Sequence, residues 1–126
     1  MKWIALLLCL PLALAACGSE DDPSDAGTLA IEAHVEPDPP RVGTNTLHLT
    51  IHDADGAPVT GAAVSVEALM PAHGHGSTEK PVITEQGGGA YTAAPLTLQM
   101  PGRWEVTIRA TAGGESGERV LRWDVQ

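Results

Sequence analysis

Two histidines and two methionines are the residues of this sequence best suited to chemistry. His73 and His75 are separated by one glycine. Met70 lies three residues before His73, and Met100 lies thirty residues after Met70. Neutral imidazole and thioether groups are ligands that favour copper, and the thioether favours the soft Cu(I) ion in particular. If one ion can reach these side chains, the sequence encodes a copper site at Met70, His73, His75 and Met100.

Other interpretations of these residues remain open. A zinc site built on His73 and His75 needs one or two further hard ligands, and Glu79 is the nearest candidate. A His-x-His segment in a loop is also commonly solvated, and a methionine at a strand end commonly fills a gap in the core. Zinc is therefore the less favoured metal, and the copper interpretation depends on whether the fold brings the four side chains together.

The elements that must position these side chains are predicted to be strands. Apolar residues alternate with polar ones in five segments, which is the pattern of half-buried strands: 29–35, 47–51, 64–68, 104–110 and 121–125. Shorter strands at 81–85 and 90–99 flank three glycines at 87–89, which suit a tight turn. About seven strands with turns between them predict an all-β fold, an immunoglobulin-like antiparallel β-sandwich. Trp104 and Trp123 are its expected large core residues, because the sequence contains no Phe.

The order of the strands predicts where the loops lie. If the strand ending at Met70 runs upward, the segment after Pro81 runs down, the strand reaching Met100 runs up again, and Arg103 begins a descent. Met70, Met100 and the histidine segment 71–76 then share one end of the sandwich. Two thioethers and two imidazoles are expected to converge there.

The N-terminal segment has the features of an export signal. Lys2 precedes an apolar run from Trp3 to Ala13, and an acidic stretch at 18–22 ends it too early for a membrane-spanning helix. The run Leu14-Ala15-Ala16-Cys17 resembles the lipobox of bacterial lipoproteins, in which the cysteine is acylated; an ordinary cleaved signal is the alternative. The predicted division is a signal peptide at 1–16, an acidic flexible tether at 17–27 and a β-sandwich domain at 28–126.

Lipidation of Cys17 would attach the protein to a membrane on its extracytoplasmic side. Cys9 would leave with the signal, so no free thiol and no disulfide would remain in the mature chain. Gly18 replaces the aspartate that commonly signals retention in the inner membrane, which favours the outer membrane if the cell has one.

Composition excludes several classes of function. The net charge of −9 becomes about −10 when Lys2 is removed, and this acidity makes nucleic acid a poor partner. It suits the solubility of a tethered protein or the attraction of cations. No nucleophile elbow, phosphate-binding loop or zinc-protease helix is present, so we expect a non-catalytic protein.

The remaining histidines are expected to be solvated. His48 and His52 lie on the outward face of one predicted strand, about 13 Å apart, and cannot share an ion. His34 is also outward and is expected near the end of the sandwich that holds the cluster, as a distant neighbour of it at most.

Three motifs together carry a family resemblance. Met70-Pro71-Ala72-His73-Gly74-His75, then Gly89-Ala90-Tyr91, then Met100-Pro101-Gly102-Arg103-Trp104 resemble the motif series of YtkA-like (FixH-related) domains, from about Leu47 to Val125. The resemblance implies a small exported or membrane-attached β-sandwich, linked with copper handling or the assembly of copper-containing oxidases. The implied ligands fall on Met70, His75 and Met100. Many members have methionine in place of His73, so a mixed or Cu(II)-capable site is conceivable here.

Two hypotheses of function follow. The first is a metal-binding module that holds copper and passes it to a membrane transporter, an oxidase or a redox protein, or senses it for such a partner. The second is an interaction or structural module without a metal, which docks on a membrane complex through a sheet face or edge.

Overall fold

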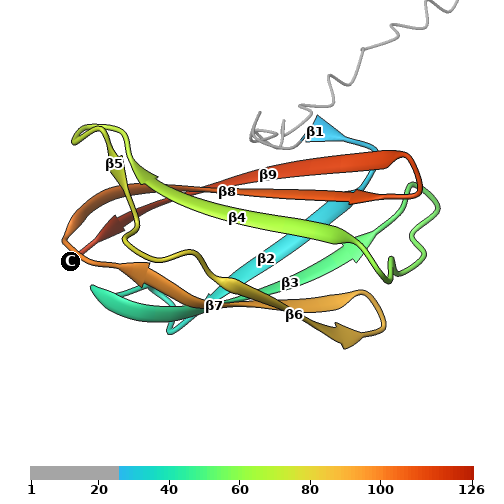
Figure 1. The fold of residues 1–126 in the computed structure, drawn as a ribbon, viewed down its shortest axis with the longest axis horizontal. Coiled ribbons are helices and arrows are strands. Elements are labelled where there is room, and N and C mark those ends of the chain that lie inside the picture. Colours follow the sequence, from blue (N-terminus) through green and yellow to red (C-terminus); the bar gives the residue numbers. More distant parts are fainter. Residues whose placement is uncertain (1–25) are drawn as a thin grey trace, which may run out of the picture.

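The computed structural model describes residues 26–126, which form two antiparallel β-sheets packed face to face (Figure 1). The predicted all-β sandwich is confirmed. The strands are β1 (Ala26–Gly27), β2 (Ala30–Glu36), β3 (Gly43–His52), β4 (Ala63–Met70), β5 (His75–Gly76), β6 (Val82–Gly87), β7 (Ala90–Leu98), β8 (Gly102–Ala112) and β9 (Glu115–Val125). β1 and β5 are two residues long, so seven strands carry the fold.

The arrangement of the seven long strands is that of an immunoglobulin constant-type domain. One sheet has the order β2-β3-β7-β6, and the other has β1-β9-β8-β4-β5. With β2 as strand A and β9 as strand G, the sheets are ABED and CFG, extended by the two short strands. The predicted immunoglobulin-like topology therefore holds.

The core lies between the sheets and is built by the alternation seen in the sequence. Leu47, Leu49 and Ile51 of β3 are buried, whereas the residues between them are partly exposed. Trp104 of β8 is fully buried, as predicted, while Trp123 of β9 is only partly buried against the core. The core also includes, among others, Leu29, Ile31, Val35, Val66, Leu96, Leu98, Val106, Ile108 and Val125.

Two buried polar side chains hold irregular backbone in place. Asn45, at a bulge between β3 and β7, accepts a hydrogen bond from Arg41 N and donates through Nδ2 to Arg41 O. The Tyr91 hydroxyl donates to Val59 O at 2.7 Å and accepts from Ala62 N at 3.1 Å. Tyr91 thus ties the connection between β3 and β4 to the sheet that contains β7.

The predicted turn at 87–89 is confirmed, with positive φ at all three glycines. At the N-terminal end, residues 26 and 27 form β1 and pair with β9, so strand structure begins within the segment that we expect to be a tether. The predicted signal at 1–16 and the lipidation site Cys17 lie outside the described residues.

Candidate metal centre

The segments that carry the four candidate ligands meet at one end of the sandwich. β4 ends at Met70, β8 begins at Gly102, and the two strands pair antiparallel with Leu69 opposite Glu105. The histidine turn and β5 lie at this same end, at the left of Figure 1, together with the end of β7. The predicted shared location of the two Met-Pro segments is therefore found, and we call this end the methionine pole.

The turn that carries His73 is fixed to the end of β4. The amides of His73 and Gly74 both donate to Met70 O, at 3.0 and 3.1 Å. Gly74 has a φ of +66°, a conformation that side chains other than glycine rarely adopt. His75 then pairs with Met70 at the start of β5. The two histidines consequently lie on either side of Gly74, where the chain turns back to pair with β4.

The two imidazoles of this turn lie close to each other and are exposed. The ring centroids of His73 and His75 are 5.7 Å apart, and the ring planes are inclined by 39°. The Nδ1 atom of His75 lies 3.3 Å from Gly76 O, which leaves Nε2 without a bond within residues 26–126. Two accessible nitrogen donors are thus available at the methionine pole.

The two methionines differ in their surroundings. Met70 is only 1% exposed and belongs to the hydrophobic core, because it continues the inward face of Val66 and Ala68. Its methyl end reaches Gly102 at the start of β8. Met100 is partly buried at the edge of the core. One thioether therefore lies inside the pole and the other at its rim.

The Met-Pro-Gly segment is held by the buried tryptophan. Trp104 Nε1 donates to Met100 O at 2.9 Å, so the indole fixes the turn that precedes its own strand. This bond joins the first and last residues of the Met100-Pro101-Gly102-Arg103-Trp104 motif and explains their spacing in structural terms. The position of Met100 is thereby tied to the core.

Gln99 is a residue of this pole that sequence reasoning missed. Its Nε2 donates to Gly76 O at 2.8 Å, and its Oε1 is buried with no hydrogen-bond partner in the described part of the chain. A buried acceptor without a partner is unusual in a folded protein and marks a place where a donor is missing. The only sequence signal was its position beside Met100.

Glu79, the possible extra zinc ligand, is engaged elsewhere. Its carboxylate accepts a bond from the Thr97 hydroxyl at 3.0 Å, and its backbone carbonyl accepts from Ser77 Oγ. Over residues 26–126, no three histidine, cysteine or acidic side chains are grouped as a metal site.

The histidines that we expect to be solvated are not equivalent. His52 lies on the outer face of β3, as predicted. His34 and His48 are opposite each other on β2 and β3, and their rings stack at 4.8 Å. This pairing depends on the register of β2 against β3, which the sequence does not reveal.

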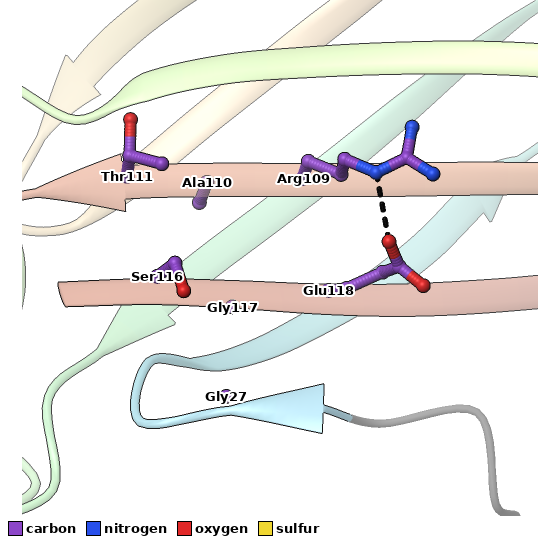
Figure 2. A pocket seen from close by; sticks show the side chains of 7 residues that line it. All are labelled: Gly27, Arg109, Ala110, Thr111, Ser116, Gly117 and Glu118. Carbon is purple, nitrogen blue, oxygen red and sulfur yellow. Dashed lines mark hydrogen bonds and ion pairs between the residues drawn. The ribbon is translucent and has the colours of Figure 1, made fainter.

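Among the surface hollows, one lies over the first and last strands, and another runs along β4 and begins beside the methionine pole at Leu69 and Gly76. Figure 2 shows the first of them, a shallow hollow over β1, β9 and β8, where Arg109 and Glu118 form an ion pair of 2.7 Å. The other is a groove of about 510 Å³ between β4 and residues 76–83. Because β5 pairs only with Leu69 and Met70, it covers one end of the β4 edge.

Exposed apolar residues accompany this groove. Leu69, which lines it, is 40% exposed. Val82 is 66% exposed and lies between Pro81 and Ile83, which line the groove, but does not itself line it. Between Ala26 and Gln126 there is no helix long and apolar enough to cross a membrane.

Comparison with known proteins identifies one family. The sequence model of a family described as YtkA-like matches residues 25–109, a range that includes both methionines and both histidines of the pole. The match begins and ends earlier than the motif resemblance at 47–125. No curated protein and no solved structure matches the chain.

Proposed function

Because the chain belongs to the YtkA-like family, we propose that it is a non-catalytic, exported metal-binding module that handles copper or delivers it to a membrane or redox partner. Its ligands are Met70, His73, His75 and Met100. The observation that carries the proposal is the meeting of the histidine turn with both Met-Pro segments at one pole of the sandwich. Segments thirty residues apart in sequence are brought together there.

The donor set suits copper better than other common metals. Imidazole nitrogen binds both Cu(II) and zinc, whereas thioether sulfur adds a preference for Cu(I). A methionine sulfur also cannot form a disulfide, which is an advantage in the oxidising compartments outside the cytoplasm. Glu79, the nearest further hard ligand for zinc, accepts a hydrogen bond from the Thr97 hydroxyl.

Access to the ligands differs, and this shapes how an ion would be held. An ion can first reach the two histidines, which are exposed, and Met100, which is only partly buried at the rim. Met70 must then turn its thioether from the core toward the pole. Gly102 lies at the end of that side chain and has no Cβ to obstruct it.

Gln99 holds the backbone oxygen that faces His75. A histidine that binds a metal through one nitrogen usually donates its other N–H to an oxygen nearby. For His75 this oxygen is Gly76 O, which lies 3.3 Å from Nδ1 and also accepts a hydrogen bond from Gln99 Nε2 at 2.8 Å. Nε2 is therefore the nitrogen of His75 that would bind the metal.

The lipid anchor on Cys17 would hold the module at an extracytoplasmic membrane surface, near a membrane transporter, an oxidase or a redox protein. Metabolic labelling with a fatty acid tests this part separately. The intact chain should incorporate label and partition into detergent, and C17S should do neither. Equal labelling of C17S would contradict the anchor.

A copper titration tests the metal-binding role. The full chain carrying C9S and C17S, so that no thiol competes, is titrated with Cu(I) against a chromogenic chelator. We expect one ion per chain, and a loss of affinity of at least a hundredfold when Met70, His73, His75 and Met100 are replaced by Leu or Asn. The matched control is H34N/H48N/H52N, which removes the other histidines and should leave Cu(I) affinity unchanged.

The groove beside β4 favours a second candidate function. Its exposed Leu69 and the partly covered β4 edge are features by which a sandwich can dock on another protein. Weak Cu(I) binding that is the same in the four-residue variant would remove the copper role and leave this one.

A further inference from the structure

A pair of histidines faces outward from the sheet that contains β2 and β3. His34 and His48 are direct partners in the antiparallel register of these strands. Their ring centroids are 4.8 Å apart and the ring planes differ by only 11°. The residues on either side of His48, Leu47 and Leu49, are buried, so the alternation of the strand directs His48 to the outer face.

A carboxylate holds one ring of this pair. Glu36 Oε2 lies 3.0 Å from His48 Nε2, and the Glu36 side chain is 74% exposed whereas that of His48 is 32% exposed. When Nε2 donates to the carboxylate, the lone pair of the neutral ring is on Nδ1. Metal-binding histidines commonly show this arrangement, in which a carboxylate fixes the tautomer and orientation of the ring.

We propose that His34 and His48 form a two-nitrogen chelate for a divalent transition-metal ion such as Zn²⁺ or Cu²⁺, with Glu36 as the positioning residue for His48. Water completes the coordination. The site offers imidazole without thioether, a donor set that suits Zn²⁺ and Cu²⁺ and does not select Cu(I). It thus differs in metal from the methionine pole.

The strand register makes the chelate accessible by small side-chain movements. Directly opposed residues of an antiparallel pair have Cβ atoms about 5 Å apart. An ion with bonds of about 2.0 to 2.1 Å needs its two nitrogens about 3 Å apart, so the His34 ring must turn toward Nδ1 of His48 while Glu36 keeps its contact with Nε2. His34 is exposed and the His48 side chain is 32% exposed, so both rings have free surface on the outer face of the sheet.

The surrounding charge favours a cation. Glu32 and Glu36 flank His34 on the outer face of β2, and both are exposed. On β3 the neighbours of His48 on this face are Thr46 and Thr50, which carry no charge. Two carboxylates beside two neutral imidazoles raise the local concentration of divalent ions.

This site is separate from the methionine pole. His48 pairs with Thr92 on β7, whereas β7 reaches the pole at Leu98. Six residues of strand correspond to about 20 Å. Loss of one site should therefore leave the other intact.

The test is a Zn²⁺ titration of the full chain carrying C9S, C17S, H73N and H75N, so that the only competing histidine is His52. We expect one Zn²⁺ to bind and to shift the ring ¹⁵N signals of His34 and His48. H34N and H48N should each lower the affinity at least tenfold. The matched control H52N removes a histidine from the same face, opposite Ala30, and should leave the affinity unchanged.

Glu36 is tested by E36Q, which keeps the shape of the side chain. We expect Zn²⁺ affinity to fall about tenfold, with a changed His48 tautomer in the ¹⁵N spectrum and an unchanged melting temperature. Zinc binding that survives H34N and H48N, or that H52N weakens equally, would overturn the proposal. These outcomes do not depend on Cu(I) binding at the pole.

Discussion

The methyl end of Met70 lies against Gly102, so that a Cβ at this glycine would approach Met70 Cε to 2.7 Å. This contact links the strand that precedes the histidine turn to the segment that follows Met100. Met70, the first candidate ligand, therefore belongs both to the hydrophobic core and to the methionine pole. The stability of the domain and its copper affinity are therefore expected to depend on the same few side chains.

The substitution G102A tests this contact. Gly102 has a φ of +132°, which an L-residue adopts only with strain, and we expect the free energy of unfolding to fall by about 1–3 kcal/mol. Urea denaturation measures it. The matched control is G43A, since Gly43 has a similar φ of +102° but no atom within 4 Å of its Cβ position.

If G102A lowers the free energy of unfolding more than G43A does, we attribute the difference to the contact with Met70. A double-variant cycle with M70A should then show a coupling between positions 70 and 102. Additive effects would contradict a contact between the two residues.

Met70 can be tested as a ligand without losing its role in the core. M70L conserves volume and should cost less than about 1.5 kcal/mol of unfolding free energy, whereas M70A should cost about 2–5 kcal/mol. If the thioether binds copper, M70L should nevertheless lower Cu(I) affinity at least tenfold. M70L that keeps full Cu(I) affinity would assign Met70 to the core alone.

The hydroxyl of Tyr91 is expected to stabilise the fold at the end of the sandwich opposite the methionine pole. Y91F removes the bonds to Val59 O and from Ala62 N and leaves two backbone groups without their partner. We expect a loss of about 1–3 kcal/mol in urea denaturation. Cu(I) affinity should not change, and a parallel fall in affinity would indicate that the two regions are coupled.

Copper binding at the pole should weaken in acid. Protons compete with a metal for imidazole nitrogen, whereas a thioether does not titrate. Between about pH 7.5 and about pH 5, where histidines change charge, Cu(I) affinity should fall in the intact site. H73N/H75N should bind more weakly throughout and show a flatter pH dependence; an intact site with level affinity would exclude imidazole ligation.

The strands and their inward faces could be predicted because the apolar alternation is regular. Leu47, Leu49 and Ile51 were expected inside and are buried. The strand directions also followed from simple reversals of the chain, which placed Met70 and Met100 at one end. Local pattern and turn residues were sufficient for both.

Side-chain relationships between strands could not be predicted in the same way. The pairing of His34 with His48 depends on the register of β2 against β3, which the connection at 37–42 sets. The burial of Met70 agrees with one of the two interpretations of its sequence position, because Met70 follows Val64, Val66 and Ala68 at a spacing of two and ends their strand.

The central claim is that thioether and imidazole donors from separate segments bind one copper ion. Cu K-edge X-ray absorption of the Cu(I)-loaded C9S/C17S chain tests it most directly. We expect both sulfur and nitrogen in the first shell, with the sulfur contribution lost in M70L/M100L and the nitrogen contribution lost in H73N/H75N. A first shell of nitrogen and oxygen alone, unchanged in M70L/M100L, would contradict the account.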